Sequence, residues 1–116
     1  MRIISQSGLL DVPYELIAIS PYSGNMATIV GTFPGNDLGK GDRVYILAEY
    51  STEEKAIKAM EMCRERYTQY IFNRHMIPET ANVLTRIPLE EAEKVRDQIT
   101  ETFIFQFPKE EEIEDE

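Results

Sequence analysis

The chain has 116 residues, 42% apolar and 28% charged, so it is long enough for one domain with a packed core and too short for two ordinary ones. Its 21 acidic and 12 basic residues give a formal net charge of −9, which argues against direct nucleic-acid binding, because that depends on Lys and Arg meeting phosphates. The single cysteine excludes an intrachain disulfide and a cysteine-rich metal site. Composition therefore favours a small acidic binding or interaction domain over an enzyme.

The first half of the sequence reads as short strands separated by turn residues. We expect five strands, at 2–6, 9–12, 14–19, 26–33 and 43–50. Ser7-Gly8 and the segment 21–25 supply turns, and the glycine-rich segment 34–42 is interpreted as a hairpin loop because it lacks the spacing of a phosphate-binding loop. Consecutive strands joined in this way form an antiparallel β-meander.

The second half is mainly helical. Ser51 and Glu54 fit a capping box, and apolar residues then recur every three or four positions as far as Ile71, which predicts one long amphipathic helix. A short helix is expected at 78–86, and Pro88 suits the first turn of a further helical segment. Alternating phenylalanines at 102–107 predict a last strand, in this sheet or in a partner's sheet.

The predicted fold class is therefore α+β: an antiparallel β-meander of about five strands, packed by one long amphipathic helix, a helical segment and a final C-terminal strand. Residues 109–116 carry six acids and one base, and runs of like charge tend to stay unfolded. We accordingly divide the chain into a single α+β domain, 1–108, and an acidic disordered tail, 109–116.

The expected location is the cytoplasm, without a membrane partner. We find no secretory leader and no apolar run long enough to span a bilayer. A meander packed by one helix would leave a sheet edge and part of the apolar helix stripe uncovered. This predicts a homo-oligomer, a dimer or larger.

Reactive groups are few. His75 is the single histidine, and Cys63 lies on the apolar helix face, where a cysteine behaves as a small hydrophobe. The carboxylates lack the spacing of a calcium-binding loop. No catalytic residue, metal site or cofactor is predicted.

The scarce arginines are the best candidates for ligand binding. Four of them fall in or after the long helix, interleaved with aromatic residues: Arg64, Arg66, Arg74 and Arg86. A guanidinium pairs with phosphate while an aromatic ring stacks on a base, so the pattern suits a phosphorylated, base-bearing ligand. Alternatively, the arginines pair with surface glutamates or the second helix, and the phenylalanines belong to the core. The candidate ligand-binding residues are Arg64, Tyr67, Arg74, Arg86 and Phe103.

Three parts of the sequence carry a resemblance: MRIIS at 1–5 with DVPYE at 11–15, AEYSTEEKA at 48–56 running into AMEM at 59–62, and FQFP at 105–108. They resemble a family of small, mostly uncharacterised phage and prophage proteins of Gram-positive bacteria. That group is similar to the Thoeris anti-defence proteins, phage sponges that sequester cyclic ADP-ribose signals. The resemblance implies an oligomer with ligand pockets at subunit interfaces and makes Arg64 the best phosphate-binding candidate. Glu101 and Thr102 depart from the family's pattern, which has asparagines there.

One function and two alternatives follow. The expected function is a phage-encoded anti-defence protein of the host bacterial cytoplasm that sequesters a small cyclic nucleotide of the cyclic ADP-ribose type without catalysis. The first alternative is an acidic protein–protein inhibitor, of the DNA-mimic or anti-CRISPR type, whose partner is a basic host defence nuclease. The second is a virion accessory protein that binds no ligand.

Overall fold

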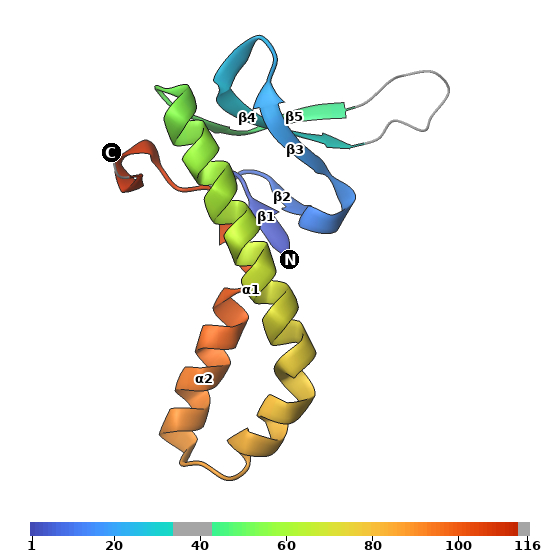
Figure 1. Ribbon diagram of the computed structural model, residues 1–116, viewed down its shortest axis with the longest axis vertical. Helices are drawn as coiled ribbons and strands as arrows, with labels where there is room; N and C mark the ends of the chain where they lie inside the picture. Colours follow the sequence, from blue (N-terminus) through green and yellow to red (C-terminus); the bar gives the residue numbers. More distant parts are fainter. Residues whose placement is uncertain (34–42, 114–116) are drawn as a thin grey trace.

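The computed structural model describes residues 1–33 and 43–113, with side chains described outside 77–84. The hairpin loop expected at 34–42 lies outside the described residues. In chain order the elements are β1 (Arg2–Ile4), β2 (Asp11–Pro13), the 3-10 turn η1 (Tyr14–Leu16), β3 (Ala18–Tyr22), β4 (Asn25–Phe33), β5 (Arg43–Glu49), α1 (Glu53–Leu84), α2 (Leu89–Glu101), β6 (Ile104–Gln106) and the 3-10 turn η2 (Glu110–Glu112) (Figure 1).

The strands form two three-stranded sheets. In the first, β1 lies between β2, its antiparallel neighbour, and β6, its parallel neighbour. In the second, β3, β4 and β5 are antiparallel, with β4 in the middle. The predicted α+β class is confirmed, whereas the single meander of about five strands is wrong.

The change of sheet occurs at Pro13 and Tyr14. Proline has no N–H with which to continue a ladder, and the Tyr14 N–H donates to the Met1 carbonyl at 2.9 Å. The chain then turns through η1, where the sequence predicted the start of a strand, and β3 begins at Ala18. This turn carries the chain out of the first sheet and into the second.

The start of α1 differs from the predicted capping box. The helix begins at Glu53, and the Lys55 N–H donates to the Thr52 hydroxyl at 3.2 Å. Thr52 therefore caps α1, and Ser51 does not. The Ser51 N–H is bonded instead to the carboxylate of Glu110 at 2.6 Å.

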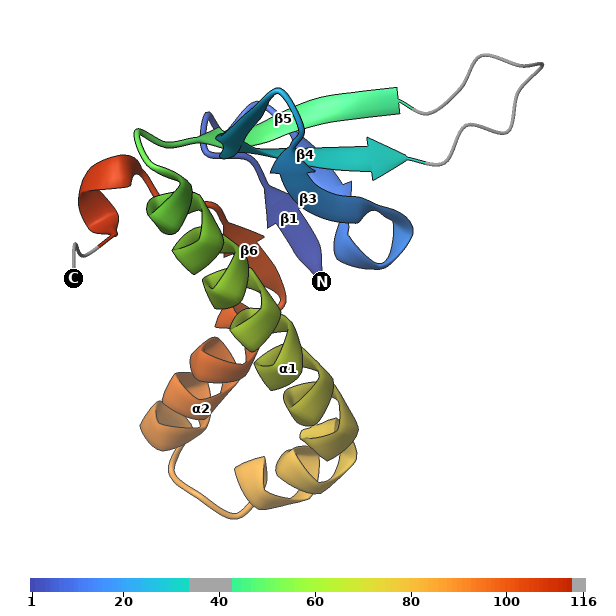
Figure 2. The ribbon, with the colours of Figure 1, turned by 45° about the horizontal axis from the view of Figure 1, so that its top comes forward.

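The far end of α1 is also different. The helix continues through Pro78 to Leu84, so the separate helix expected at 78–86 belongs largely to α1. A proline removes one helical hydrogen bond but has a φ that suits a helix, and α1 continues through it without a break. As predicted, α2 opens directly after Pro88. Together α1 and α2 form a hairpin that projects away from the sheets (Figure 2).

The core lies where the first half of α1 meets both sheets (Figure 2). Ala56 and Ala59 are fully buried, and their small side chains allow α1 to approach the strands closely. Gln6 connects the sheets, because its N–H donates to the Leu47 carbonyl at 2.7 Å and its side-chain carbonyl accepts the Glu49 N–H at 3.0 Å. Strand β5 is thereby tied to the end of β1.

The predicted C-terminal strand is present as β6, beside β1. Arg66 joins this strand to α1: one guanidinium nitrogen donates to the carbonyls of Glu101 at 2.7 Å and Ile104 at 3.0 Å. The guanidinium carbon also lies 6.0 Å from the centre of the Phe105 ring. Arg66 therefore has a structural role. The sequence analysis had considered such a role as the alternative to ligand binding.

The C-terminal segment 109–113 packs against the domain. Ile113 is buried among core residues, and the Tyr50 hydroxyl donates to the Pro108 carbonyl at 2.7 Å just before the segment. The disordered tail expected at 109–116 is thus incorrect for 109–113, because Ile113 interrupts the acidic run with apolar surface that the core can bury. Residues 114–116 lie outside the described part of the chain.

Acidification is expected to loosen this segment. The hydrogen bond from Ser51 and the charge of Lys55 hold the pKa of Glu110 below its ordinary value of 4.5. A carboxyl whose pKa is lower in the folded state gives stability that is complete above the unfolded pKa and is lost as pH falls through the folded pKa. We expect the melting temperature of the unchanged protein to exceed that of Glu110→Gln at neutral pH. The difference between the two melting temperatures should disappear below about pH 4.5. Thermal melts of both proteins from neutral to acidic pH would measure this, and a gap that is independent of pH would contradict it.

Candidate functional site

Four aromatic rings form a continuous row of contacts that runs from η1, across α1, to the residue before β6. Tyr14 of η1 stacks on Tyr67 of α1, with ring centres 4.2 Å apart and 28° between the planes. Tyr67 meets Tyr70 edge-on at 5.9 Å, and Tyr70 meets Phe103 edge-on at 5.4 Å. The row therefore links the η1 turn, the middle of α1 and the segment that leads into β6.

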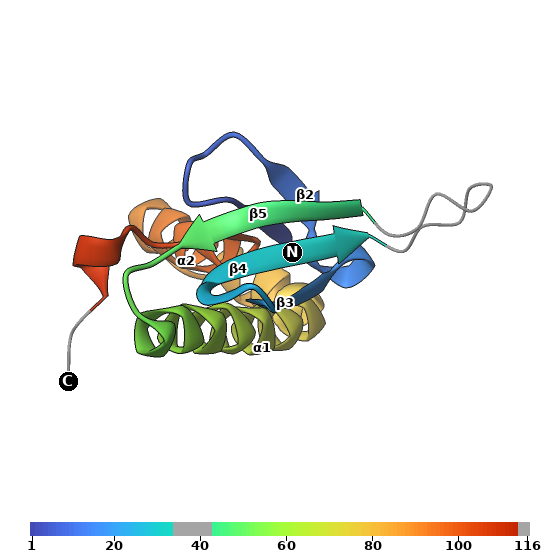
Figure 3. The same ribbon diagram turned by 90° about the horizontal axis from the view of Figure 1, so that it is seen from above.

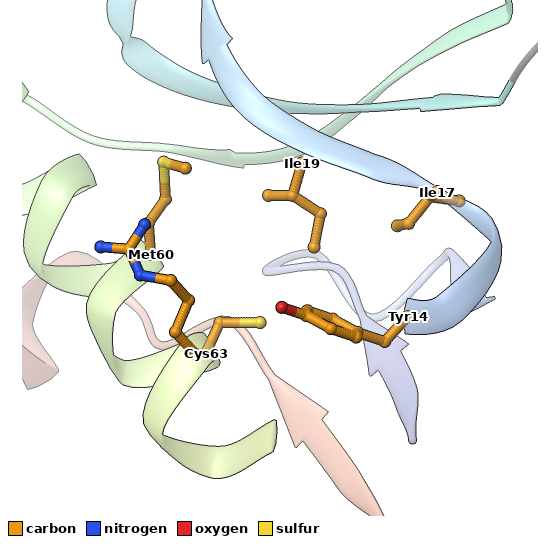
Figure 4. Close-up of a pocket in the computed structure, with 6 residues that line it drawn as sticks. Tyr14, Ile17, Ile19, Met60 and Cys63 are labelled. Atoms are coloured by element: carbon orange, nitrogen blue, oxygen red, sulfur yellow. The ribbon is translucent and has the colours of Figure 1, made fainter. Parts of the chain in front are cut away.

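A pocket of about 110 Å³ lies at one end of this row. It is formed where β3 and η1 face α1, and Figure 4 shows the Tyr14 hydroxyl pointing toward the Cys63 sulfur across it. Arg64 is exposed and contributes the positive charge of the lining. The residues lining the pocket are Tyr14, Ile17, Ile19, Met60, Cys63 and Arg64.

The two polar groups that face each other in this pocket stay protonated. Burial raises the pKa of the Cys63 thiol to about 12, so at neutral pH it is not the thiolate that nucleophilic catalysis requires. Burial, with the neighbouring Cys63 and Tyr67 groups, also raises the pKa of Tyr14. The pocket therefore presents neutral hydrogen-bonding groups beside one guanidinium.

Arg74 lies further along α1, near the carboxylate of Glu15. Partial burial raises the pKa of Glu15, but the hydrogen bond from the Met1 ammonium at 2.8 Å and nearby positive charge, including Arg74, outweigh it and leave the pKa below its ordinary value. Glu15 thus offsets part of the charge of Arg74. Arg74 is therefore the weaker of the two arginines as a contact for an anion, because Glu15 offsets part of its charge.

The structure brings together some of the predicted site residues and separates others. Arg64, Tyr67 and Arg74 follow helical spacing along one side of α1, and Phe103 ends the aromatic row. Arg86 does not join them, because it lies in the turn between α1 and α2 at the tip of the projecting hairpin (Figure 1). Tyr14 belongs to the site but was not predicted.

No family model, curated protein or solved structure matches the chain. The chemistry of the site must therefore be inferred from its own residues. Within residues 1–33 and 43–113, no group of three or more His, Cys, Asp or Glu side chains is placed to hold a metal ion. Among the helices of the same described residues, none combines the length and apolarity needed to cross a membrane.

Proposed function

We propose that this protein binds, without turnover, a small phosphorylated nucleotide of the cyclic ADP-ribose type. The observation that carries the proposal is the position of Arg64, which lines a pocket next to the stacked Tyr14 and Tyr67 rings. A guanidinium forms forked hydrogen bonds with phosphate oxygens, and aromatic rings stack on a base. The two kinds of group required by such a ligand thus meet at one place.

The size of the pocket determines how the ligand would sit. Complete small-ligand sites enclose about 300–1,000 Å³. The pocket of about 110 Å³ fits one group of the nucleotide, such as a ribose or a phosphate. The rest of the ligand would lie along α1 toward Arg74, with further contacts from a second copy of the chain, as the family resemblance implies.

Capture without catalysis is supported by the lining of the pocket. The Cys63 thiol is protonated at neutral pH, and no histidine or carboxylate lines the pocket that could act as its base. A stoichiometric binder of an immune signal would act in the cytoplasm of a phage-infected bacterium. There it would lower the free concentration of the signal.

Isothermal titration with cyclic ADP-ribose isomers tests this function. We expect saturable binding, recovery of unchanged nucleotide by chromatography, and a higher melting temperature with ligand, because a ligand that binds only the folded state stabilises it. Arg64→Ala should weaken binding about 10- to 100-fold through loss of charge-assisted hydrogen bonds. Arg86→Ala is the matched control and should bind normally. If ligand in large excess produces neither heat nor a shift in melting temperature, the proposal is wrong.

The acidic-inhibitor alternative has one observation in its favour. The acidic side chains of α2 are exposed on the projecting hairpin, as expected of a surface that meets a basic protein (Figure 2). Binding of this kind would weaken steeply with salt. It would be lost on replacing the α2 residues Glu90, Glu91 and Glu93 with Gln.

A further inference from the structure

The Arg64 pocket lies at an edge of the second sheet. β3 is an edge strand of the β3–β4–β5 sheet, and Figure 3, which looks down on this sheet, shows β3 on the same side of the view as α1. Ile17 and Ile19, at the start of β3, line the pocket opposite the α1 residues Met60, Cys63 and Arg64. Because Arg64 is exposed, a molecule in solution can reach the pocket past its side chain.

Two polar side chains that line this pocket are free to bind a ligand. Within residues 1–33 and 43–113, neither the Tyr14 hydroxyl nor the Arg64 guanidinium is engaged in a hydrogen bond or an ion pair with a described side chain or backbone group. The charge of Arg64 nevertheless acts on Tyr14: burial is the largest influence and raises the pKa of Tyr14, while Arg64 acts in the opposite direction. The guanidinium therefore lies within electrostatic reach of the hydroxyl.

The Tyr14 hydroxyl is held in position before a ligand arrives. Its ring stacks on Tyr67 at 4.2 Å, and its backbone N–H donates to the Met1 carbonyl at 2.9 Å. Figure 4 shows the hydroxyl directed across the pocket toward the Cys63 sulfur. Because the pKa of Tyr14 is raised, the hydroxyl stays protonated at neutral pH and can donate a hydrogen bond. A donor fixed in advance loses little conformational freedom when it binds.

The lining supplies hydrogen-bond donors and no negative charge. Arg64 only donates, and the Tyr14 hydroxyl and the Cys63 thiol can both donate. Among the described residues, no carboxylate or amide side chain lines the pocket. Ribose hydroxyls are commonly held by a carboxylate acceptor, whereas phosphate oxygens only accept and carry the charge that a guanidinium pairs with. Of a ribose and a phosphate, the lining therefore suits the phosphate.

We propose that Tyr14 selects the phosphate of the ligand: its hydroxyl donates to an oxygen of the phosphate that pairs with Arg64. The phosphate then occupies the pocket, and the ribose and base lie outside it. The apolar walls formed by Ile17 and Ile19 strengthen both contacts, since hydrogen bonds are stronger where water is excluded. This inference rests on the proposed function, because it concerns the same pocket, but it requires only a phosphate and not the cyclic ADP-ribose skeleton.

An NMR titration of the full chain with inorganic pyrophosphate, at constant ionic strength, is the first test. We expect saturable shifts of the Tyr14 and Arg64 amide signals, with a dissociation constant of about 1 mM. Adenosine, which has no phosphate, should leave these signals unchanged at the same concentration. The absence of shifts with pyrophosphate, or shifts with adenosine alone, would overturn the assignment of the pocket to phosphate.

Tyr14→Phe isolates the hydroxyl, because the ring that stacks on Tyr67 is retained. We expect the dissociation constant for pyrophosphate to rise about tenfold, the loss of one hydrogen bond to a charged group. Tyr70→Phe is the matched control: Tyr70 belongs to the same row of rings but does not line the pocket, so its affinity should stay within about twofold. Equal affinities of the unchanged protein and Tyr14→Phe would refute the role of the hydroxyl. Thermal melts of both variants would identify any loss caused by misfolding.

The same variants separate this inference from the proposed function. Pyrophosphate binding that depends on the Tyr14 hydroxyl, without any binding of cyclic ADP-ribose isomers, would refute the proposed function and support the phosphate pocket. Binding of a cyclic ADP-ribose isomer that Tyr14→Phe leaves unchanged would refute the role of Tyr14 alone.

Discussion

Replacing Phe107 with alanine should lower the free energy of unfolding by about 3–5 kcal/mol. The Phe107 side chain is 1% exposed, and its ring meets that of Phe105 edge-on at 5.2 Å. The backbone N–H of Phe107 would still donate to the Ile4 carbonyl, so the strand would stay paired and the missing ring would leave a cavity. Thermal unfolding followed by circular dichroism should show a melting temperature about 10–20 °C lower.

Phe72→Ala removes the same atoms from a different environment and is the matched control. Phe72 is 63% exposed on α1, so its loss should change the unfolding free energy by no more than about 0.5 kcal/mol. Equal losses for the two variants would show that the ring of Phe107 is not in the core, and the assignment of β6 to the first sheet would then fail with it.

Truncation after Pro108 should destabilise the domain by about 1.5–3 kcal/mol, the contribution of burying one large aliphatic side chain. Ile113 is 5% exposed, and it would be removed together with the Glu110 carboxylate that accepts the Ser51 N–H at the start of α1. Urea unfolding of the truncated and full chains would measure the difference. Truncation after Ile113 is the control and should unfold at nearly the urea concentration of the full chain.

The result separates two descriptions of the acidic C-terminus. A purely solubilising tail could be removed at either position without effect on stability. A docked segment is sensitive to the first truncation and not to the second. Identical midpoints for the full chain and the chain ending at Pro108 would contradict the packing of Ile113.

Most elements could be located from the sequence because their signals are local. β4 and β5 differ from the predicted ranges 26–33 and 43–50 by one residue at one end. The first apolar turns of α1 and the start of α2 after Pro88 were also placed correctly. Alternation, helical spacing and a proline at a helix start all depend on residues only a few positions apart.

The pairing of the strands could not be found in this way. Neighbouring strands in sequence often pair, and this preference led to a single meander. In the structure β1 pairs with β6, which lies at the other end of the domain, and η1 separates β2 from β3. Both outcomes depend on contacts between residues that are distant in sequence, such as the bond from the Phe107 N–H to the Ile4 carbonyl.

The candidate site shows the same division. The sequence was enough to place Arg64 and Tyr67 in the long helix and Arg74 in it or after it. The stack of Tyr14 on Tyr67 could not be predicted, because it depends on η1 turning back over α1. Arg86 is remote because α1 continues through Pro78, and a proline normally indicates a helix boundary.

From the sequence alone came the α+β class, the main helices, most of the strands and the arginines interleaved with aromatic residues in the long helix, since each follows from the chemistry of nearby residues. The tertiary structure alone decided that there are two sheets, that Arg66 and Ile113 are structural, and that Tyr14 completes the aromatic row. The reason is physical: burial and long-range hydrogen bonding are satisfied by the whole chain at once, and a short segment does not specify which distant partner will supply them.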